Sequence, residues 1–315
     1  FILFCFSCWP FWLAAQVNEP SYEIHFSPAE KKWIQNHPQL NYSGDPFWEP
    51  LSFYHEDLYQ GLIVDYMEEI SKRTGIEFKP LKQATWQDTI TALHDQSISF
   101  IDAMTPSQER IKRFDFTDAF LSLDIVLITR NDIKFIGDMD DLAKKSIGTT
   151  QGYVTIDYLA QDYPTWEVRQ FPTVSKGLLA LLNKEVDVYI TDLPSFSHYS
   201  ELLGIRDLKV SGITPYKFNL GIALPKGQHE LRGILNQAIA TFTHREKSAL
   251  FRRWVPLAYA EKTNYTLLFR VGGCFLIILL LTLLWLNQVH KQKLALQNSK
   301  ERFNSKNDLW TLQST

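Results

Sequence analysis

Several features that mark common protein classes are scarce or missing in this sequence of 315 residues. It has three cysteines, Cys5, Cys8 and Cys274, all in apolar stretches near the ends. Residues 16–269 therefore cannot rely on disulfides and must fold around a hydrophobic core. No GxxxxGK(S/T), HExxH or GxSxG motif is present, which argues against P-loop nucleotide hydrolases, zinc peptidases and serine hydrolases of the usual signature. The eight histidines show no metal-ligand spacing, and we expect neither a metal nor a cofactor.

Neither sign of charge dominates the chain. Lys and Arg number 32 against 35 Asp and Glu, which is not the basic excess that nucleic-acid binding needs. Residues 16–269 are acidic, with 26 basic and 33 acidic side chains, whereas residues 287–315 are basic. We therefore expect no nucleic-acid partner, and an acidic folded part followed by a basic tail.

Two apolar segments flank the acidic part. Residues 1–15, FILFCFSCWPFWLAA, are uncharged and end in small residues, as the apolar region of a secretory signal peptide does. An uncleaved first membrane helix is the alternative. Residues 265–286 are long and apolar enough to form a transmembrane helix. The signal peptide would place residues 20–262 in the periplasm and residues 287–315 in the cytoplasm, with a single pass through a bacterial inner membrane.

Short apolar segments alternate with amphipathic ones through the acidic part. Helical periodicity is clearest at Leu62–Thr74, which ends at Gly75. The alternation predicts an α/β fold in two blocks, with mainly parallel sheets covered by helices. We expect strands at 40–42, 77–80, 100–103, 125–129, 146–148, 167–170, 188–190 and 220–224. We expect helices at 62–74, 86–94, 107–114, 154–160, 174–183, 230–242 and 247–254.

Seven segments, taken in order, resemble solute-binding protein family 3, especially its versions in sensor histidine kinases and cyclic-di-GMP enzymes. They are SPAEKKWIQNHPQL at 27–40, GDPFWEPLSF at 44–53, QGLIVDYMEEISKRTG at 60–75, ISFIDAMTPSQERIKRFDFTDAF at 98–120, IGTTQG at 147–152, EVDVYITD at 185–192 and FRRW at 251–254. The resemblance implies a two-lobed periplasmic-binding-protein fold of type 2, the Venus flytrap, with two crossover hinge strands. Lobe one would hold about 38–128 and 218–256, lobe two about 130–214, with hinges near 129–130 and 215–218.

Arg110 lies in TPSQER at the start of a predicted helix. The resemblance implies that its guanidinium grips a ligand carboxylate through two parallel hydrogen bonds. Thr105 would be a further contact, although the run from Asp102 to Arg110 is a few residues shorter than in the transport proteins. The alternative for Arg110 is a surface ion pair with a neighbour such as Asp115.

Asp192 follows an apolar strand in the second block, and Trp48 follows Asp45 in the first loop. The resemblance implies that Asp192 receives a ligand ammonium group and that Trp48 forms a stacking wall. Asp192 is also placed to cap the helix that starts at Leu193, and Trp48 could instead pack in the core. These alternatives stay open at the level of sequence.

The turn from Gly148 to Gly152 leads into a helix, an arrangement whose free N–H groups can bind an anion. Gln151, Gly152 and Tyr153 are therefore expected contacts, although an ordinary tight turn has the same pattern. The amino-acid binders tend to have Ser or Thr after the second glycine. Tyr153 departs from that pattern and favours a different or aromatic ligand.

The tail at 287–315 resembles the signalling helix that follows such sensors, and SKERF at 299–303 resembles the start of a PAS domain. We therefore expect a sensing domain that binds an amino acid or small carboxylate between two lobes. A kinase or cyclase domain would follow residue 315, and a homodimer would form through the membrane and juxtamembrane helix. Two rivals stay open: a tethered binding protein of an amino-acid ABC transporter, and an enzyme in which Asp45 or Asp192 acts beside Arg110.

Overall fold

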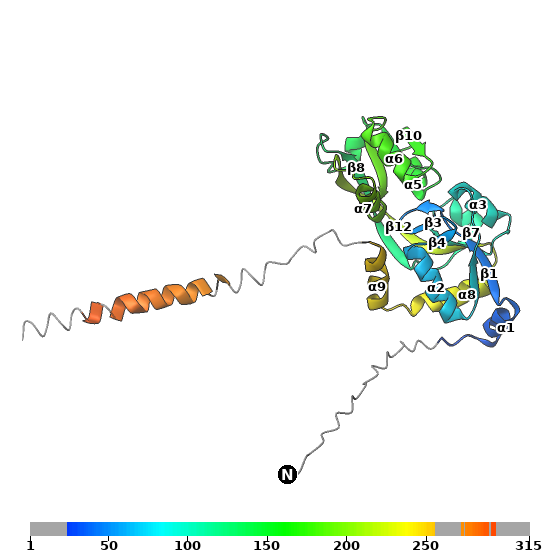
Figure 1. Cartoon of the computed structure of the whole chain (residues 1–315), viewed down its shortest axis with the longest axis horizontal. Helices are drawn as coiled ribbons and strands as arrows, with labels where there is room; N and C mark the ends of the chain where they lie inside the picture. The colour runs from blue at the N-terminus through cyan, green and yellow to red at the C-terminus, as the bar shows by residue number, and fades with distance from the viewer. Residues whose placement is uncertain (1–23, 256–271, 274, 290, 294–315) are drawn as a thin grey trace, which may run out of the picture. The chain divides into compact units, whose positions relative to one another are not determined.

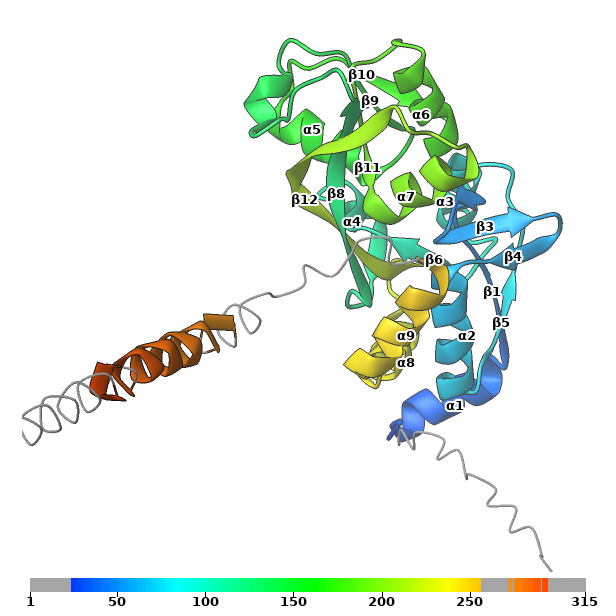
Figure 2. The same ribbon diagram turned by 60° about the vertical axis from the view of Figure 1, so that its left-hand side comes forward.

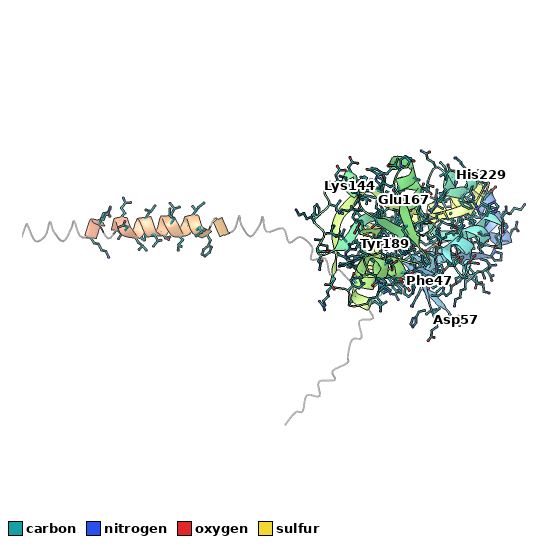
Figure 3. All side chains as sticks on the ribbon, turned by 90° about the horizontal axis from the view of Figure 1, so that it is seen from above. Phe47, Asp57, Lys144, Glu167, Tyr189 and His229 are labelled. Carbon is teal, nitrogen blue, oxygen red and sulfur yellow. The ribbon has the colours of Figure 1, made fainter. Side chains whose placement is uncertain are left out.

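The computed structural model describes residues 24–255, 272–273, 275–289 and 291–293, and the chain divides into two compact units, residues 1–256 and residues 257–315 (Figure 1). The predicted signal peptide at 1–15 and the predicted PAS-like segment lie outside the described residues. In the second unit, the helix Phe275–Lys293 is long and apolar enough to cross a membrane, and none of its apolar window is buried. Its side chains project on all sides (Figure 3).

The first unit is built from alternating helices and strands. Its helices are α1 Pro28–Asn36, α2 Leu62–Thr74, α3 Trp86–His94, α4 Arg110–Arg113, α5 Val154–Asp162, α6 Val174–Leu182, α7 Leu193–Leu202, α8 His229–Ala240 and α9 His244–Trp254, with a 3-10 turn at Met139–Leu142. Its strands are β1 Gln39–Ser43, β2 Phe47–Trp48, β3 Ser52–His55, β4 Leu58–Gln60, β5 Glu77–Pro80, β6 Phe100–Met104, β7 Phe114–Phe116, β8 Leu121–Arg130, β9 Ile147–Thr150, β10 Val168–Phe171, β11 Val188–Asp192 and β12 Leu208–Pro225.

The main sheet follows the order β10-β9-β11-β8-β12-β6-β1-β5, and β7 also pairs with β12. Strands β5, β1 and β6 are parallel and form lobe one with α1 to α4, α8 and α9. Strands β10, β9 and β11 are parallel and form lobe two with α5, α6 and α7 (Figure 2). The predicted two-lobed α/β fold is therefore confirmed.

The lobes are joined by β8 and β12, which pair with each other in antiparallel register from Leu208 opposite Arg130 to Leu220 opposite Leu121. The residues of β8 from Ile125 to Thr129 also pair with β11 of lobe two. The crossing on β8 therefore lies before Ile125, a few residues earlier than the expected hinge at 129–130. On β12, a register shift between Ile213 and Lys217 lies close to the second expected hinge.

Helix α2 shows why local sequence specifies this fold. Its last residue is followed by Gly75 at φ 71°, the left-handed conformation that glycine adopts most readily. At its start, Gly61 has φ 134°, and a Cβ there would lie 2.2 Å from the carbonyl oxygen of Leu51. The buried face of α2 includes Leu62, Ile63, Met67 and Ile70 and packs into the hydrophobic core of lobe one.

Lobe two packs closely around Tyr189, which is fully buried on β11 (Figure 3). Its hydroxyl group is hydrogen-bonded to Oγ1 of Thr150 at 2.7 Å. Gly177 on α6 lies so close to this ring that a Cβ there would be 2.0 Å from it. A larger residue at Gly177 would therefore push α6 away from the sheet.

Two sequence expectations need correction, and one small sheet was not expected. The helix expected at 107–114 is the single turn α4, and Phe114–Phe116 form strand β7 against β12. The strand expected at 220–224 is the end of the 18-residue strand β12. A three-stranded antiparallel sheet, β2-β3-β4, lies in a stretch for which no element was expected.

Candidate functional site

Two buried hydrogen bonds cross the cleft between the lobes in opposite directions. Nε1 of Trp48 in lobe one donates to Oδ2 of Asp192 in lobe two at 2.8 Å. The hydroxyl of Tyr153 in lobe two donates to Oδ2 of Asp45 in lobe one at 2.8 Å. Each lobe thus supplies one aromatic donor and one carboxylate acceptor.

Local structure fixes the second oxygen of each carboxylate. Asp45 follows β1, and its Oδ1 accepts the backbone N–H of Phe47 at 2.9 Å. Asp192 ends β11, and its Oδ1 accepts the backbone N–H of Ser195 at 2.8 Å, so it caps α7. The capping role considered for Asp192 is therefore present, and it leaves Oδ2 directed at the other lobe.

Burial dominates the electrostatics of these carboxyl groups. It raises the pKa of Asp45 to about 6, although the bonds from Phe47 and Tyr153 oppose the shift. Burial also raises the pKa of Asp192, against the bonds from Trp48 and Ser195. Donors supplied across the cleft therefore stabilise the charged form of each group. A cationic solute would act on both groups in the same direction.

Three aromatic rings line the centre of the cleft. The ring centroids of Trp48 and Tyr153 are 5.4 Å apart, and both rings meet Phe218 of β12 nearly edge-on, at 5.7 and 6.0 Å. Phe218 lies close to the crossing between the lobes and was not among the expected contacts. Trp48, which was expected to form a stacking wall for a solute, thus packs in a cluster of rings from both lobes and the crossing strand.

Arg110 also bridges the lobes, but through main-chain oxygens. Its Nη1 donates to the carbonyl of Thr105 at 2.9 Å, and its Nη2 donates to the carbonyl of Gly152 at 2.8 Å. Its Nε lies 3.7 Å from Oδ2 of Asp157. Burial lowers the pKa of Arg110, and Asp157 opposes that shift. The alternative partner Asp115 instead pairs with Lys226 at 3.0 Å.

The turn before α5 presents a carbonyl oxygen to lobe one. The oxygen of Gly152 accepts from Arg110 and also from Nε1 of Trp86 at 3.0 Å. Gly152 has φ 73°, and a Cβ there would lie 3.1 Å from the ring of Trp86. Gln151 is exposed at the rim of the cleft, where it lines a hollow of about 400 Å³ together with Gly152 and Asp157.

The space left at the centre of the cleft is about 20 Å³, which is room for about one water molecule. Its walls include Asp45, Trp48, Thr105, Arg110 and Tyr153. Thr105 is buried there, and its Oγ1 has no hydrogen-bond partner among the described residues. An amino acid would fit only after aromatic side chains or whole lobes move.

Further contacts between the lobes were missed at the level of sequence. The hydroxyl of Tyr199 on α7 donates to Oε2 of Glu49 and lies 3.4 Å from the carbonyl oxygen of Phe47. Ser107 in lobe one donates to Asp157 on α5 at 2.6 Å. The sequence signal for the contacts of Glu49 and Ser107 was weak. Each is a polar residue close in the chain to Trp48 or Arg110, and most such residues contact only water. Within the described parts of both units, no three His, Cys, Asp or Glu side chains gather as a metal site.

Comparison with known proteins agrees with this architecture. The virulence sensor protein BvgS of Bordetella bronchiseptica is 22% identical over 272 residues, which are 85% of this chain and 22% of BvgS. The chain thus spans less than a quarter of that relative's length. The crystal structure of the Bordetella pertussis BvgS periplasmic VFT2 domain has a TM-score of 0.68 at 21% identity, covering 74% of this chain and 100% of that domain.

An ancestral arginine-binding protein, solved bound to arginine, has a TM-score of 0.61 at 23% identity and covers 69% of this chain and 98% of its own. These similarities show a shared fold. The sequence pattern of one family matches residues 40–256, the span that contains both lobes and the cleft. The chain belongs to the bacterial extracellular solute-binding proteins, family 3.

Proposed function

We propose that residues 20–262 are the extracytoplasmic solute-sensing domain of a membrane-bound signalling receptor. The solute binds between the lobes, and the change is passed through a transmembrane helix at 265–286 to the tail at 287–315. The observation that carries this proposal is the reciprocal exchange between Trp48–Asp192 and Tyr153–Asp45, which joins the lobes through side chains able to bind a solute instead. A solute that replaces these donors changes the relation between the lobes.

The chemistry of the cleft favours a solute with an amino group. Asp45 and Asp192 are both buried acceptors that take N–H or O–H donors across the cleft. An ammonium group would supply the same donors with a positive charge, and the faces of Trp48 and Tyr153 attract cations. Arg110 can grip a carboxylate by releasing the carbonyls of Thr105 and Gly152. An amino acid would engage both kinds of group.

Two further observations support a sensor in a bacterial inner membrane. The similarity to the sensor protein BvgS extends over 85% of this chain. The second unit contains the apolar helix Phe275–Lys293, whose side chains are exposed in the structure as a lipid-facing helix requires. A reporter test of this topology uses phosphatase and cytoplasmic-reporter fusions at Tyr259. An active phosphatase is expected there, and an active cytoplasmic reporter at that position would contradict the proposal.

A thermal-shift screen of the full chain in lipid nanodiscs tests solute binding. The panel holds amino acids, their decarboxylated amines and their deaminated acids. A solute at 100 times its dissociation constant stabilises the domain by about 2.7 kcal/mol. Hits should weaken by about 2–5 kcal/mol in Arg110→Ala if they carry a carboxylate, since a buried charge then loses its partner. Trp48→Ala should weaken every hit.

The outcomes separate the site from the ligand class. A hit that keeps its full shift in both variants, while both stay folded, would place the site elsewhere. A hit that needs Arg110 but not Asp192 would be an acid without the amino group. A solute-dependent change in labelling of Leu296→Cys, in a background lacking the native cysteines, distinguishes a sensor from a tethered binding protein. Turnover of a hit would favour an enzyme.

A further inference from the structure

We infer that the β2–β3 hairpin, residues 47–55, relays the state of the cleft to the end of α9, the last helix before the second unit. The inference rests on the proposed sensing function, since it concerns how that signal leaves the domain. The hairpin touches lobe two on one side and α9 on the other. No other described element makes both contacts through hydrogen bonds or ring contacts.

On the cleft side, β2 is held by helix α7 of lobe two. Trp48 donates to Asp192, the residue that caps α7, and the bond is buried. One residue further on, Glu49 accepts the hydroxyl of Tyr199, which lies two turns along the same helix. Two adjacent residues of the hairpin therefore follow any movement of α7.

On the other side, the hairpin touches the end of α9. Phe47 of β2 pairs with Phe53 of β3 in the antiparallel register. The ring of Phe53 meets the ring of Trp254 edge-on, with centroids 6.0 Å apart and planes at 87°. Trp254 is the last residue of α9. One strand pair and one ring contact thus connect the β2 strand that contains Trp48 to the end of the domain.

A second connection runs through the turn of the hairpin. The carbonyls of Pro50 and Leu51 accept the backbone N–H groups of Leu62 and Ile63, at 3.1 and 2.8 Å, and so cap the first turn of α2. Asp65 in that turn accepts Nε1 of Trp254 at 2.8 Å and also Nη1 of Arg253 at 3.1 Å. The turn therefore positions the acceptor that holds α9.

The start of α9 is anchored differently. Arg73, with a side chain that is 1% exposed, pairs with Glu246 at 2.6 Å and lies 3.7 Å above the ring of Phe242. These contacts join α9 to the far end of α2, remote from the hairpin. Figures 1 and 2 both show α9 beside α2. The start of α9 is thus a fixed point, and its end, where the chain leaves for the second unit, is the part that the hairpin can move.

Two matched variants test this relay without any solute. Trp48→Phe removes the hydrogen bond between the hairpin and Asp192, while Trp86→Phe removes another tryptophan hydrogen bond between the lobes, to Gly152, that does not involve the hairpin. The readout is amide hydrogen exchange of the full chain in nanodiscs at Phe251–Val255. We expect Trp48→Phe to raise exchange there by about three- to tenfold, the usual net effect of losing one hydrogen bond. Trp86→Phe should leave it unchanged.

A coupling variant sharpens the test. In a Phe53→Leu background, Trp48→Phe should raise exchange at the end of α9 by a smaller factor than it does alone, because only the connection through Asp65 remains, whereas purely local effects of the two substitutions would simply add. Exchange in α8 and at the start of α9 serves as the internal control. Phe53 does not line the cleft, so Phe53→Leu should still bind any solute found by thermal shift. Loss of the relay is thereby distinguished from loss of sensing.

The remaining results would overturn the relay. Equal increases in Trp48→Phe and Trp86→Phe would mean that α9 responds to separation of the lobes by any route. No increase in either variant would mean that the hairpin does not control α9. An increase spread evenly over the whole domain in Trp48→Phe would indicate general loss of stability rather than a directed path.

Discussion

Trp48 and Asp192, 144 residues apart in the chain, are joined by a buried hydrogen bond of 2.8 Å between the indole Nε1 and the carboxylate Oδ2. One was expected to stack on a solute and the other to receive its ammonium group. In the structure each is the other's partner. The polar atoms of both side chains are therefore satisfied within the protein, and the binding proposed above would be an exchange of partners rather than the filling of a preformed pocket.

The hydroxyl of Tyr153 offers a direct measure of that exchange. Tyr153→Phe removes the donor to Asp45 and should lower the free energy of unfolding by about 1.5–3 kcal/mol, the usual contribution of a hydrogen bond to a charged group. Chemical denaturation of the full chain in mild detergent gives the value. Tyr163→Phe is the matched control, because the ring of Tyr163 stacks on Trp166 at the surface of lobe two. A loss of the same size in the control would contradict the assignment.

The free energy of unfolding should decrease as pH rises from about 4 to about 7. Burial raises the pKa of Asp45 to about 6 and that of Asp102 to about 7, from 3.8 in each case. In this range the folded protein binds protons that the unfolded chain has released, so protonation favours the folded state. Carboxyls with lowered pKa act in the opposite sense, but mainly at more acidic pH; they are Asp115, Asp187 and Glu246.

Urea unfolding between pH 4.5 and 8 checks this trend. Asp45→Asn should flatten the part of the curve below pH 6, where the carboxyl changes its mean charge, while keeping an acceptor for Tyr153. Asp102→Asn should flatten the part of the curve that extends to about pH 7. Like Asp45→Asn, it keeps an acceptor for its tyrosine partner, since the hydroxyl of Tyr59 donates to Asp102 at 2.7 Å. A wild-type stability that climbs with pH across this window would show that these carboxyls are solvated.

Asp192 has two roles that substitution can separate. Asp192→Asn keeps a capping side chain for α7 but removes the charge, so stability should change by less than about 1 kcal/mol. Asp192→Ala removes the charge, the cap and the acceptor of Trp48, and should cost about 1 kcal/mol for the lost cap and about 1–3 kcal/mol more for the unpaired Nε1 of Trp48. Thermal unfolding gives the stabilities. Affinity for an amino-bearing solute should fall in both variants by a similar factor, and a normal affinity in Asp192→Asn would remove the carboxylate from the site.

The anchor of α9 should be energetically distinct from surface ion pairs. Glu246→Gln removes the charge beside the buried Arg73, and we expect a loss of about 2 kcal/mol in the free energy of unfolding. Glu109→Gln is the control, because its partner Lys112 is 65% exposed, and such pairs contribute roughly 0–1 kcal/mol. Equal effects in denaturant titrations would mean that Arg73 is solvated.

Much of the fold could be predicted because local signals agreed with the tertiary structure. The expected helices at Leu62–Thr74 and Trp86–His94 and the strand at Glu77–Pro80 have the observed bounds. Gly75 ends the first helix, and Thr85 caps the second through the N–H of Asp88. Where an apolar pattern is bounded by its own cap or turn, sequence is sufficient.

Other elements depend on contacts far away in the chain. The expected helix at 107–114 is cut short because Phe114 and Phe116 pair with Pro225 and Ala223 of β12. The local sequence around these phenylalanines does not indicate a strand, because their pairing partners lie about 110 positions later in the chain. The β2-β3-β4 sheet was missed because its strands are two to four residues long, too short for alternation to be visible.

In the cleft, residue types were more predictable than partners. All of Trp48, Thr105, Arg110, Tyr153 and Asp192 lie at the contact between the lobes. Every residue has a main-chain oxygen, however, so the sequence could not indicate that the carbonyl of Gly152 is the acceptor for Arg110. The same holds for Phe218, whose position at the cleft follows from the register of β12 against β8. Their roles toward a solute stay predictions.

The paired strands β8 and β12 also set how sensitive the domain can be. Their pairing runs from one lobe into the other, so we expect separation of the lobes in the proposed sensor to bend this ribbon without breaking its pairing. The side-chain bonds across the cleft would then account for most of the free-energy difference between the open and closed states. A tenfold decrease in the open population lowers the apparent affinity for an entering solute about tenfold. Glu49 and Tyr199 join the lobes outside the walls of the central space. In the proposed sensor, we therefore expect their bond to shift the solute concentration needed for a response without changing which solute is bound.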